Sequence, residues 1–205
     1  MKDFSFEVKS AFFRRKLGAA EHREFQILEK ALQITYEEGF EGLQFAALAK
    51  KCKISRPLIH HYFKTRLDLA ERLLELTTLH LKNYVTERFA KEGGTHLELY
   101  CRASLDWPAE HRVAACGLLI FVQVSSSAEL LRKRNDELSA VGKETIKALL
   151  IEAGSRSDLP YKSTAIQCIL TGCCLNLITE NLTKQESLAL RRHGLKACME
   201  IAKVK

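Results

Sequence analysis

Six basic side chains lie close together between Gly42 and Leu67, and no Asp or Glu separates them. A run of cations without carboxylates can bind the phosphates of a nucleic acid, or it can be a solvated surface that has no partner. Charge alone does not decide between these interpretations. The six residues are Lys50, Lys51, Lys53, Arg56, Lys64 and Arg66.

The basic character of the chain is concentrated near its N-terminus. The 205 residues carry 32 Lys and Arg against 25 Asp and Glu. Residues 1–66 contain 13 basic and 8 acidic residues, whereas residues 67–205 contain 19 and 17 and are nearly neutral. This asymmetry favours a small polyanion-binding domain at residues 1–66, followed by a larger domain at residues 67–205.

Two short amphipathic patterns coincide with the basic run. The first, over residues 45–52, has its apolar residues at spacing i, i+3, i+4 and i+7. The second, from Ser55 to Lys64, places Ile59, Tyr62 and Phe63 at i, i+3 and i+4. Two short helices joined by a tight turn share a core only if they cross steeply, which is helix-turn-helix geometry. The outer face of the second helix then enters the major groove of DNA.

Inward packing of those apolar residues leaves the polar side chains of the second helix on one outer surface. Arg56 is suited to bidentate contact with guanine and equally to a phosphate, and the sequence leaves both roles open. The other contacts are expected at phosphates or as neutral hydrogen bonds. The predicted DNA contacts are Gln44, Ser55, Arg56, Pro57, His60, His61 and Lys64, with the basic cluster Arg14, Arg15 and Lys16 expected in a neighbouring minor groove.

Apolar periodicity predicts helices along the remaining chain, which only three prolines interrupt. One helix is expected at about 21–38, with Gly39 as its C-terminal cap. A long helix begins after a capping box formed by Thr65 and Asp68 and runs to about Lys91. Further helices are expected at about 95–106, 109–124, 127–153, 161–181 and 184–203. The expected fold is all-α, with about nine helices: a three-helix N-terminal domain followed by a larger helical domain.

Other classes of protein find no support in the sequence. Charges within the first ten residues argue against a secretory signal, so we expect a cytoplasmic protein. Two charge-free stretches, 113–128 and 163–179, are short and partly polar, which favours buried helices over membrane spans. The seven cysteines are expected to be reduced, and His–Cys pairs five residues apart do not share a helix face. We expect no metal, cofactor or catalytic site.

The order and spacing of residues 27–69 resemble the DNA-binding domain of the TetR family of bacterial regulators. Several positions depart from the family pattern: Gln44 stands where a capping Thr is common, and Lys53 stands where the turn usually has Gly. His60 replaces a Tyr that contacts phosphate, while Ala46 and Pro57 replace a frequent Arg and Gly. The matching residues are Ile27, Leu28, Ala31, Leu32, Gly39, Phe40, Leu48, Ala49, Lys50, Ile54, Ser55, Arg56, His61, Tyr62, Phe63 and Leu69.

The resemblance implies a homodimeric transcriptional repressor that binds a palindromic operator and is released by a small-molecule effector. The last two helices would form a four-helix dimer interface, with contacts at Ala165, Ile169, Gly172, Cys173 and Leu177. An effector pocket would lie in the middle helices, and the lack of a strongly charged cluster there favours a neutral or apolar effector. Residues that would line it, each equally suited to an ordinary core, are Tyr84, Tyr100, Cys101, Trp107, His111, Leu118 and Phe121.

Two other functions are compatible with the same sequence. A DNA-binding activator or architectural protein would have the same N-terminal domain and no effector. A helical enzyme or adaptor with a basic surface would show turnover or protein association without salt-sensitive DNA binding.

Overall fold

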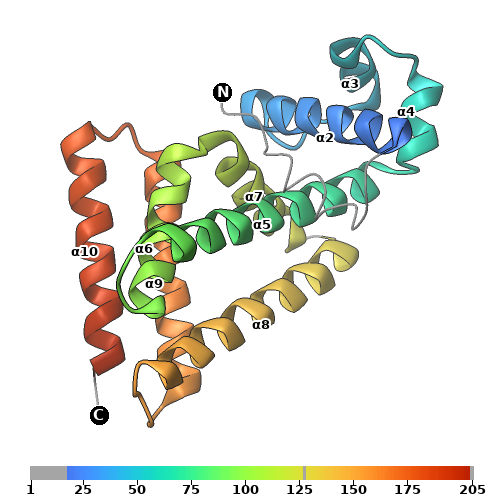
Figure 1. Ribbon diagram of the computed structural model, residues 1–205. Helices are drawn as coiled ribbons and strands as arrows, with labels where there is room; N and C mark the ends of the chain where they lie inside the picture. Colours follow the sequence, from blue (N-terminus) through green and yellow to red (C-terminus); the bar gives the residue numbers. More distant parts are fainter. Residues whose placement is uncertain (1–17, 127, 204–205) are drawn as a thin grey trace. The chain divides into compact units, whose positions relative to one another are not determined.

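The computed structural model describes residues 18–126 and 128–203, and within these ranges every regular element is a helix (Figure 1). The described residues form two compact units. The first contains the residues up to Asn83 together with Val113–Asn135, and the second contains Tyr84–Arg112 and the residues from Asp136 onwards. In chain order the helices are α2 (Ala19–Glu38), α3 (Phe45–Cys52), α4 (Arg56–Tyr62), α5 (Arg66–Lys91), α6 (His96–Glu110), α7 (Arg112–Ser125), α8 (Glu129–Glu152), α9 (Leu159–Thr179) and α10 (Lys184–Lys203).

The all-helical fold is as predicted, and most helix ends lie within a few residues of the expected positions. The main difference is at Pro108, which was expected to separate two helices but lies inside α6. A proline removes one helical hydrogen bond and strains the preceding turn. Here Trp107 and Pro108 are both buried, and this burial offsets the loss. The helix therefore continues to Glu110 and ends where the His111 N–H donates to the Trp107 carbonyl oxygen at 2.8 Å.

The first unit is built around α2, whose apolar residues are buried as the sequence predicts except for Tyr36, which is 41% exposed. Phe25, Leu28 and Leu32 are almost fully inaccessible to solvent. The helix ends at Gly39, whose φ of 71° is unfavourable for a residue with a side chain. The Gly39 N–H donates to the Thr35 carbonyl oxygen at 3.0 Å. This cap directs the chain into the short loop that precedes α3.

Helix α7 packs closely on α2 in the same unit. A β-carbon at Gly117 would lie only 2.7 Å from the Leu32 Cδ2 atom, so a larger residue cannot fit without displacing its neighbours. Arg72 of α5 adds a polar connection, because its guanidinium contacts Glu24 of α2 at 2.8 Å. These contacts fix the helix against which α3 and α4 are assembled.

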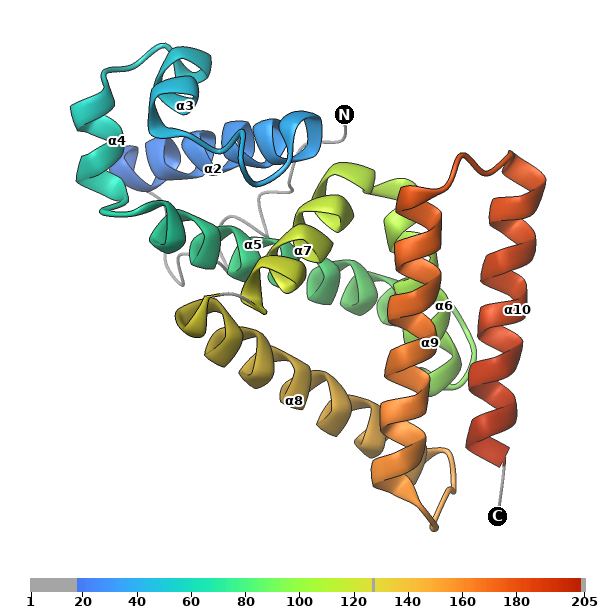
Figure 2. The same cartoon turned by 180° about the vertical axis from the view of Figure 1, so that it is seen from behind.

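The second unit has a core where α6, α9 and α10 meet. Figure 2 shows α9 and α10 lying side by side over much of their length. At Gly194 of α10 the space for a β-carbon is filled by the Cys173 sulfur, 2.9 Å away, and by Leu105 of α6. Close approach of the three helices therefore depends on small residues at their contact.

No helix of the described residues has both the length and the apolar character needed to cross a membrane. The two charge-free stretches fall mainly in α7 and α9. Both helices contribute buried residues to their units, as the sequence predicts.

Candidate nucleic-acid interface

The turn between α3 and α4 places Lys53 in the left-handed backbone region, with φ 55° and ψ 44°. The Lys53 N–H donates to the Lys50 carbonyl oxygen at 3.2 Å, and the Ile54 N–H donates to that of Ala49 at 3.0 Å. These two bonds define a Schellman motif, in which glycine is the usual residue at the left-handed position. The structure thus shows that this turn does require a positive φ, and a lysine adopts it.

Helix α4 is divided sharply between a buried and an exposed side. Ile59 is fully buried, and Phe63, the first residue after the helix, is 1% exposed. Tyr62, which was expected to face inward, is only half-buried. The helix is also shorter than predicted, because Phe63 adopts an extended conformation with φ −133° and ψ 117°.

The outer surface of the two short helices contains all the described residues that were predicted to contact DNA. Each is exposed, and the hydroxyl of Ser55 makes no capping hydrogen bond although Ser55 precedes the helix. The structure therefore brings these side chains onto an accessible surface. They are Gln44, Ser55, Arg56, Pro57, His60, His61 and Lys64; the predicted contacts Arg14, Arg15 and Lys16 lie outside the described residues.

Gln44 precedes α3 but does not cap it. Its backbone is extended, with φ −97° and ψ 140°, as a capping residue requires, but its side chain forms no cap. Instead, the Gln44 Nε2 donates to the Glu41 carbonyl oxygen at 3.0 Å. The first N–H groups of α3 consequently have no partner from the Gln44 side chain.

Ion pairing separates the six cations of the basic run into two groups. Lys51 is paired with Glu37 of α2 at 2.5 Å. Arg66 contacts Glu41 at 3.3 Å, and its guanidinium lies 4.5 Å from the centre of the Phe40 ring. Two of the six charges are therefore largely neutralised within the chain.

The other four cations form no ion pair with any described residue, and all four are exposed: Lys50, Lys53, Arg56 and Lys64. Lys50 and Lys53 were not among the predicted contacts, although both belong to the basic run. The sequence did show Lys50 and Lys53 as positive charges within the basic run. It did not show which lysines have partners, because Glu37 is 14 positions from Lys51.

The seven residues proposed to line an effector pocket do not lie in one unit. Leu118 and Phe121 belong to the first unit and the others to the second. Trp107 and Cys101 are at most 1% exposed and belong to the core. Tyr100 is half-buried, and burial raises its pKa to about 12. Tyr84 and His111 do meet, with ring centres 5.3 Å apart, but a role for these residues in binding an effector stays a prediction.

The expectation that the middle helices lack a strongly charged cluster is wrong. Arg88 of α5 contacts the carboxylates of Glu92 at 2.7 Å, Glu110 at 3.1 Å and Asp106 at 3.4 Å. Its Nη2 also donates to the Tyr84 hydroxyl at 2.6 Å. Ion pairs that join residues of different helices cannot be read from charge spacing along one helix. The premise that favoured a neutral or apolar effector therefore fails.

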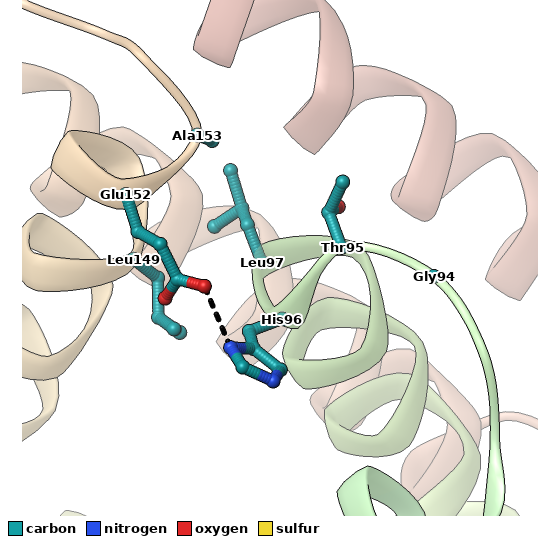
Figure 3. Close-up of a pocket in the computed structure, with 7 residues that line it drawn as sticks. All are labelled: Gly94, Thr95, His96, Leu97, Leu149, Glu152 and Ala153. Carbon is teal, nitrogen blue, oxygen red and sulfur yellow. Dashed lines mark hydrogen bonds and ion pairs between the residues drawn. The ribbon is translucent and has the colours of Figure 1, made fainter.

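A small pocket of about 130 Å³ opens in the second unit near the start of α6 (Figure 3). His96 projects toward Glu152, and its Nδ1 lies 2.7 Å from the Glu152 Oε1 atom. Both side chains are more than half exposed, at 52% and 56%. None of the predicted effector-lining residues borders this pocket. The small volume of this pocket and the exposure of His96 and Glu152 are those of a shallow hollow on the surface.

The predicted dimer contacts fall into two groups. Cys173 and Leu177 are buried within their own unit, at 9% and 5% exposure. Ala165, Ile169 and Gly172 are half-buried. Sequence inspection missed the exposed residues of α9, which carry no charge and follow one another at intervals of three or four: Tyr161, Thr164, Cys168, Thr171, Leu175 and Thr179.

Three of the cysteines lie in the core of the second unit. The Cys101 and Cys198 thiols are hydrogen-bonded to each other, which together with burial raises the pKa of Cys101. Burial also raises the pKa of Cys173. Among the described residues, no group of three or more His, Cys, Asp or Glu side chains is arranged to hold a metal ion. The three thiols are placed as packing residues of this core.

Comparison with known proteins agrees with this geometry. Residues 27–73 match the sequence model of a family described as bacterial regulatory proteins, tetR family. The chain is similar in structure to a TetR-like transcriptional regulator from Rhodococcus sp. RHA1, with a TM-score of 0.66, 17% identity and coverage of 90% of this chain and 99% of the other. For a second Rhodococcus regulator the same four values are 0.75, 15%, 88% and 97%, and for a TetR family regulator from Thermus thermophilus they are 0.66, 17%, 85% and 97%. No curated protein matches the chain.

Two short helices in contact, the tight turn between them and the exposed outer face of the second, beside cations that have no ion pair with a described residue, define a helix-turn-helix unit. Residues 27–73 are similar in sequence to bacterial regulatory proteins of the TetR family, and the chain shares its fold with solved TetR-like regulators.

Proposed function

We propose that this protein is a homodimeric repressor that binds a palindromic operator through α3 and α4 and is released by a small-molecule effector. The observation that carries the DNA-binding part is the division of the basic run. Four of its six cations are exposed and form no ion pair with a described residue, next to an outer face of α4 that has no carboxylate. An exposed cation without an internal partner releases counterions when it meets a phosphate.

Two double variants with equal changes in formal charge test this proposal. Arg56→Ala with Lys64→Ala removes two unpaired cations, and Lys51→Ala with Arg66→Ala removes two that already have carboxylate partners. The first variant should weaken DNA binding and reduce the slope of log affinity against log salt by about 0.9 for each phosphate that is no longer neutralised. The second should change this slope much less. Equal slopes in the two variants would contradict the assigned surface.

Selection of bound sequences from a random DNA pool tests the mode of binding. One short helix-turn-helix binds DNA weakly, so two copies related by a two-fold axis are needed to contact two half-sites. A palindromic consensus is the expected result. Recovery of DNA without any consensus would favour an architectural protein, and no salt-sensitive binding at all would favour the adaptor or enzyme alternative.

The uncharged exposed residues of α9 support the homodimer. Their spacing of three and four is typical of a helix that packs along another helix. Tyr161 is 80% exposed and Leu175 is 49% exposed in the single chain, and a second copy would cover both. A β-carbon at Gly172 would meet nothing within 4 Å, so a neighbouring helix has room to approach there. Light scattering at micromolar concentration should give the mass of two chains, and a monomeric mass would contradict the proposal.

The proposal also includes repression of transcription and release of the operator by a small-molecule effector. A ligand that binds one of two conformations shifts the population toward that conformation, and this would couple a site in the second unit to release of DNA. Arg88 and its carboxylate partners make a charged or strongly polar effector as suitable as an apolar one. A thermal-shift screen with a metabolite library, followed by DNA release by each hit, tests this part.

A further inference from the structure

Two adjacent imidazoles lie on the outer face of α4, where the proposed DNA contact is made. His60 and His61 are both exposed, and neither forms a hydrogen bond or ion pair with a described residue. The edge of the His60 ring packs on Phe45 of α3, with ring centres 4.7 Å apart. The His61 ring packs against Tyr62, with centres 5.3 Å apart. Aromatic contacts therefore position both rings without neutralising a charge.

The charged groups around these rings are cationic. On α4 itself, Arg56 precedes His60 by four residues and so lies on its side of the helix, and the exposed Lys64 follows shortly after the helix ends. Helix α3, which packs against α4, contributes the exposed Lys50.

Three carboxylates of the neighbouring elements are already engaged. Glu37 of α2 is paired with Lys51, and Glu41 of the preceding loop is paired with Arg66. Asp68, in the first turn of α5, accepts from the Thr65 N–H at 3.0 Å. Glu37, Glu41 and Asp68 are therefore each committed to another partner than His60 or His61.

We infer that DNA binding by this chain takes up protons at His60 and His61, so that affinity rises as the solution becomes more acidic. This inference rests on the proposed DNA-binding function. Histidine changes its charge between about pH 5 and 8, and a phosphate beside the ring favours the charged form. Because the bound state holds the protons more firmly than the free protein does, acid favours binding. The gain is complete at low pH and is lost as the pH rises through the range in which the bound imidazoles deprotonate.

The test is a fluorescence-anisotropy titration of the full chain with a labelled duplex of mixed sequence at low salt, at about pH 6 and pH 8. Phosphate contact does not depend on base sequence, so the operator need not be known. For each imidazole that takes up a proton, a shift of one pH unit in its titration corresponds to about a tenfold gain in affinity. The slope of log affinity against log salt should also be steeper at the lower pH, by about 0.9 for each proton taken up.

Matched variants assign the effect to particular rings. His60→Gln and His61→Gln should each reduce the difference between the two pH values, and the double variant should abolish it. His60→Tyr retains an aromatic ring against Phe45 and a hydrogen-bonding group but does not titrate in this range, so it should also lose its share of the pH dependence. His193→Gln, on α10 in the other unit, should retain the full dependence.

Each outcome has a distinct meaning. DNA binding with the same affinity at both pH values would overturn the inference and leave the proposed function intact. A pH dependence that survives in the double glutamine variant would also overturn it. Absence of binding at either pH would contradict the proposed function itself.

Discussion

Replacing Lys53 by glycine and by alanine distinguishes two effects of this residue, its effect on the stability of the helix-turn-helix and its effect on DNA binding through its charge. Lys53 holds φ 55° and ψ 44° at the end of α3. In this region a β-carbon costs about 1–2 kcal/mol, and glycine avoids that cost. Glycine also increases the conformational entropy of the unfolded chain, which costs about 0.4–1 kcal/mol. The free energy of unfolding should therefore be higher for Lys53→Gly than for Lys53→Ala by roughly 0.5–1 kcal/mol.

The two substitutions should act identically on DNA binding, because each removes the same unpaired cation. Either variant should reduce the slope of log affinity against log salt by about 0.9 per subunit if the Lys53 ammonium contacts a phosphate. The glycine variant is thus expected to be the more stable protein and an equally weakened DNA binder.

Urea denaturation of both variants measures the first effect, and anisotropy titrations at several salt concentrations measure the second. Lys53→Asn is a useful third variant, since asparagine enters the left-handed region more readily than most residues. It should fall between glycine and alanine in stability. Equal stability of the glycine and alanine variants would refute the argument that the Schellman turn is strained by its side chain.

Other predictions concern single positions of the same fold. Gln44→Thr should stabilise the protein by about 1 kcal/mol in urea denaturation, because it supplies the side-chain cap that α3 lacks. Gly117→Ala should destabilise it by about 1–3 kcal/mol, since its β-carbon meets a side chain of α2 at 2.7 Å. Gly172→Ala should not disturb the fold of a single chain, where its β-carbon meets nothing within 4 Å, but should weaken dimerisation in sedimentation experiments if a second copy packs there. The Thr183 hydroxyl and N–H lower the pKa of Glu186, so Thr183→Ala should reduce thermal stability at neutral pH, and the reduction should shrink as the pH falls into the range where Glu186 protonates.

Local patterns were sufficient to predict the helices. Residues 45–52 form α3 with the predicted bounds, because their apolar spacing favours this helix even though Gln44 does not cap it and Lys53 occupies a left-handed turn position. The capping box at Thr65 is also as predicted: the Asp68 N–H donates to the Thr65 hydroxyl at 3.0 Å, and the Thr65 N–H donates to the Asp68 carboxylate at 3.0 Å. Such features involve residues three or four positions apart, so their geometry follows directly from the helical repeat.

Ion pairs and packing contacts between distant residues could not be predicted in the same way. These contacts decide which charges and which helix faces are left exposed to a partner. Lys50 and Lys51 are neighbours of the same type, yet only Lys51 meets a carboxylate of α2. Cys173 and Gly172 are also neighbours, but Cys173 packs against α10 and Gly172 faces open space. Successive helical residues differ by about 100° in direction, so one of each pair can be satisfied inside the chain while the other is left for a partner. The surfaces proposed to bind DNA and a second copy are therefore those whose residues have no described partner after folding, and the variants at Lys53 and Gly172 test this argument.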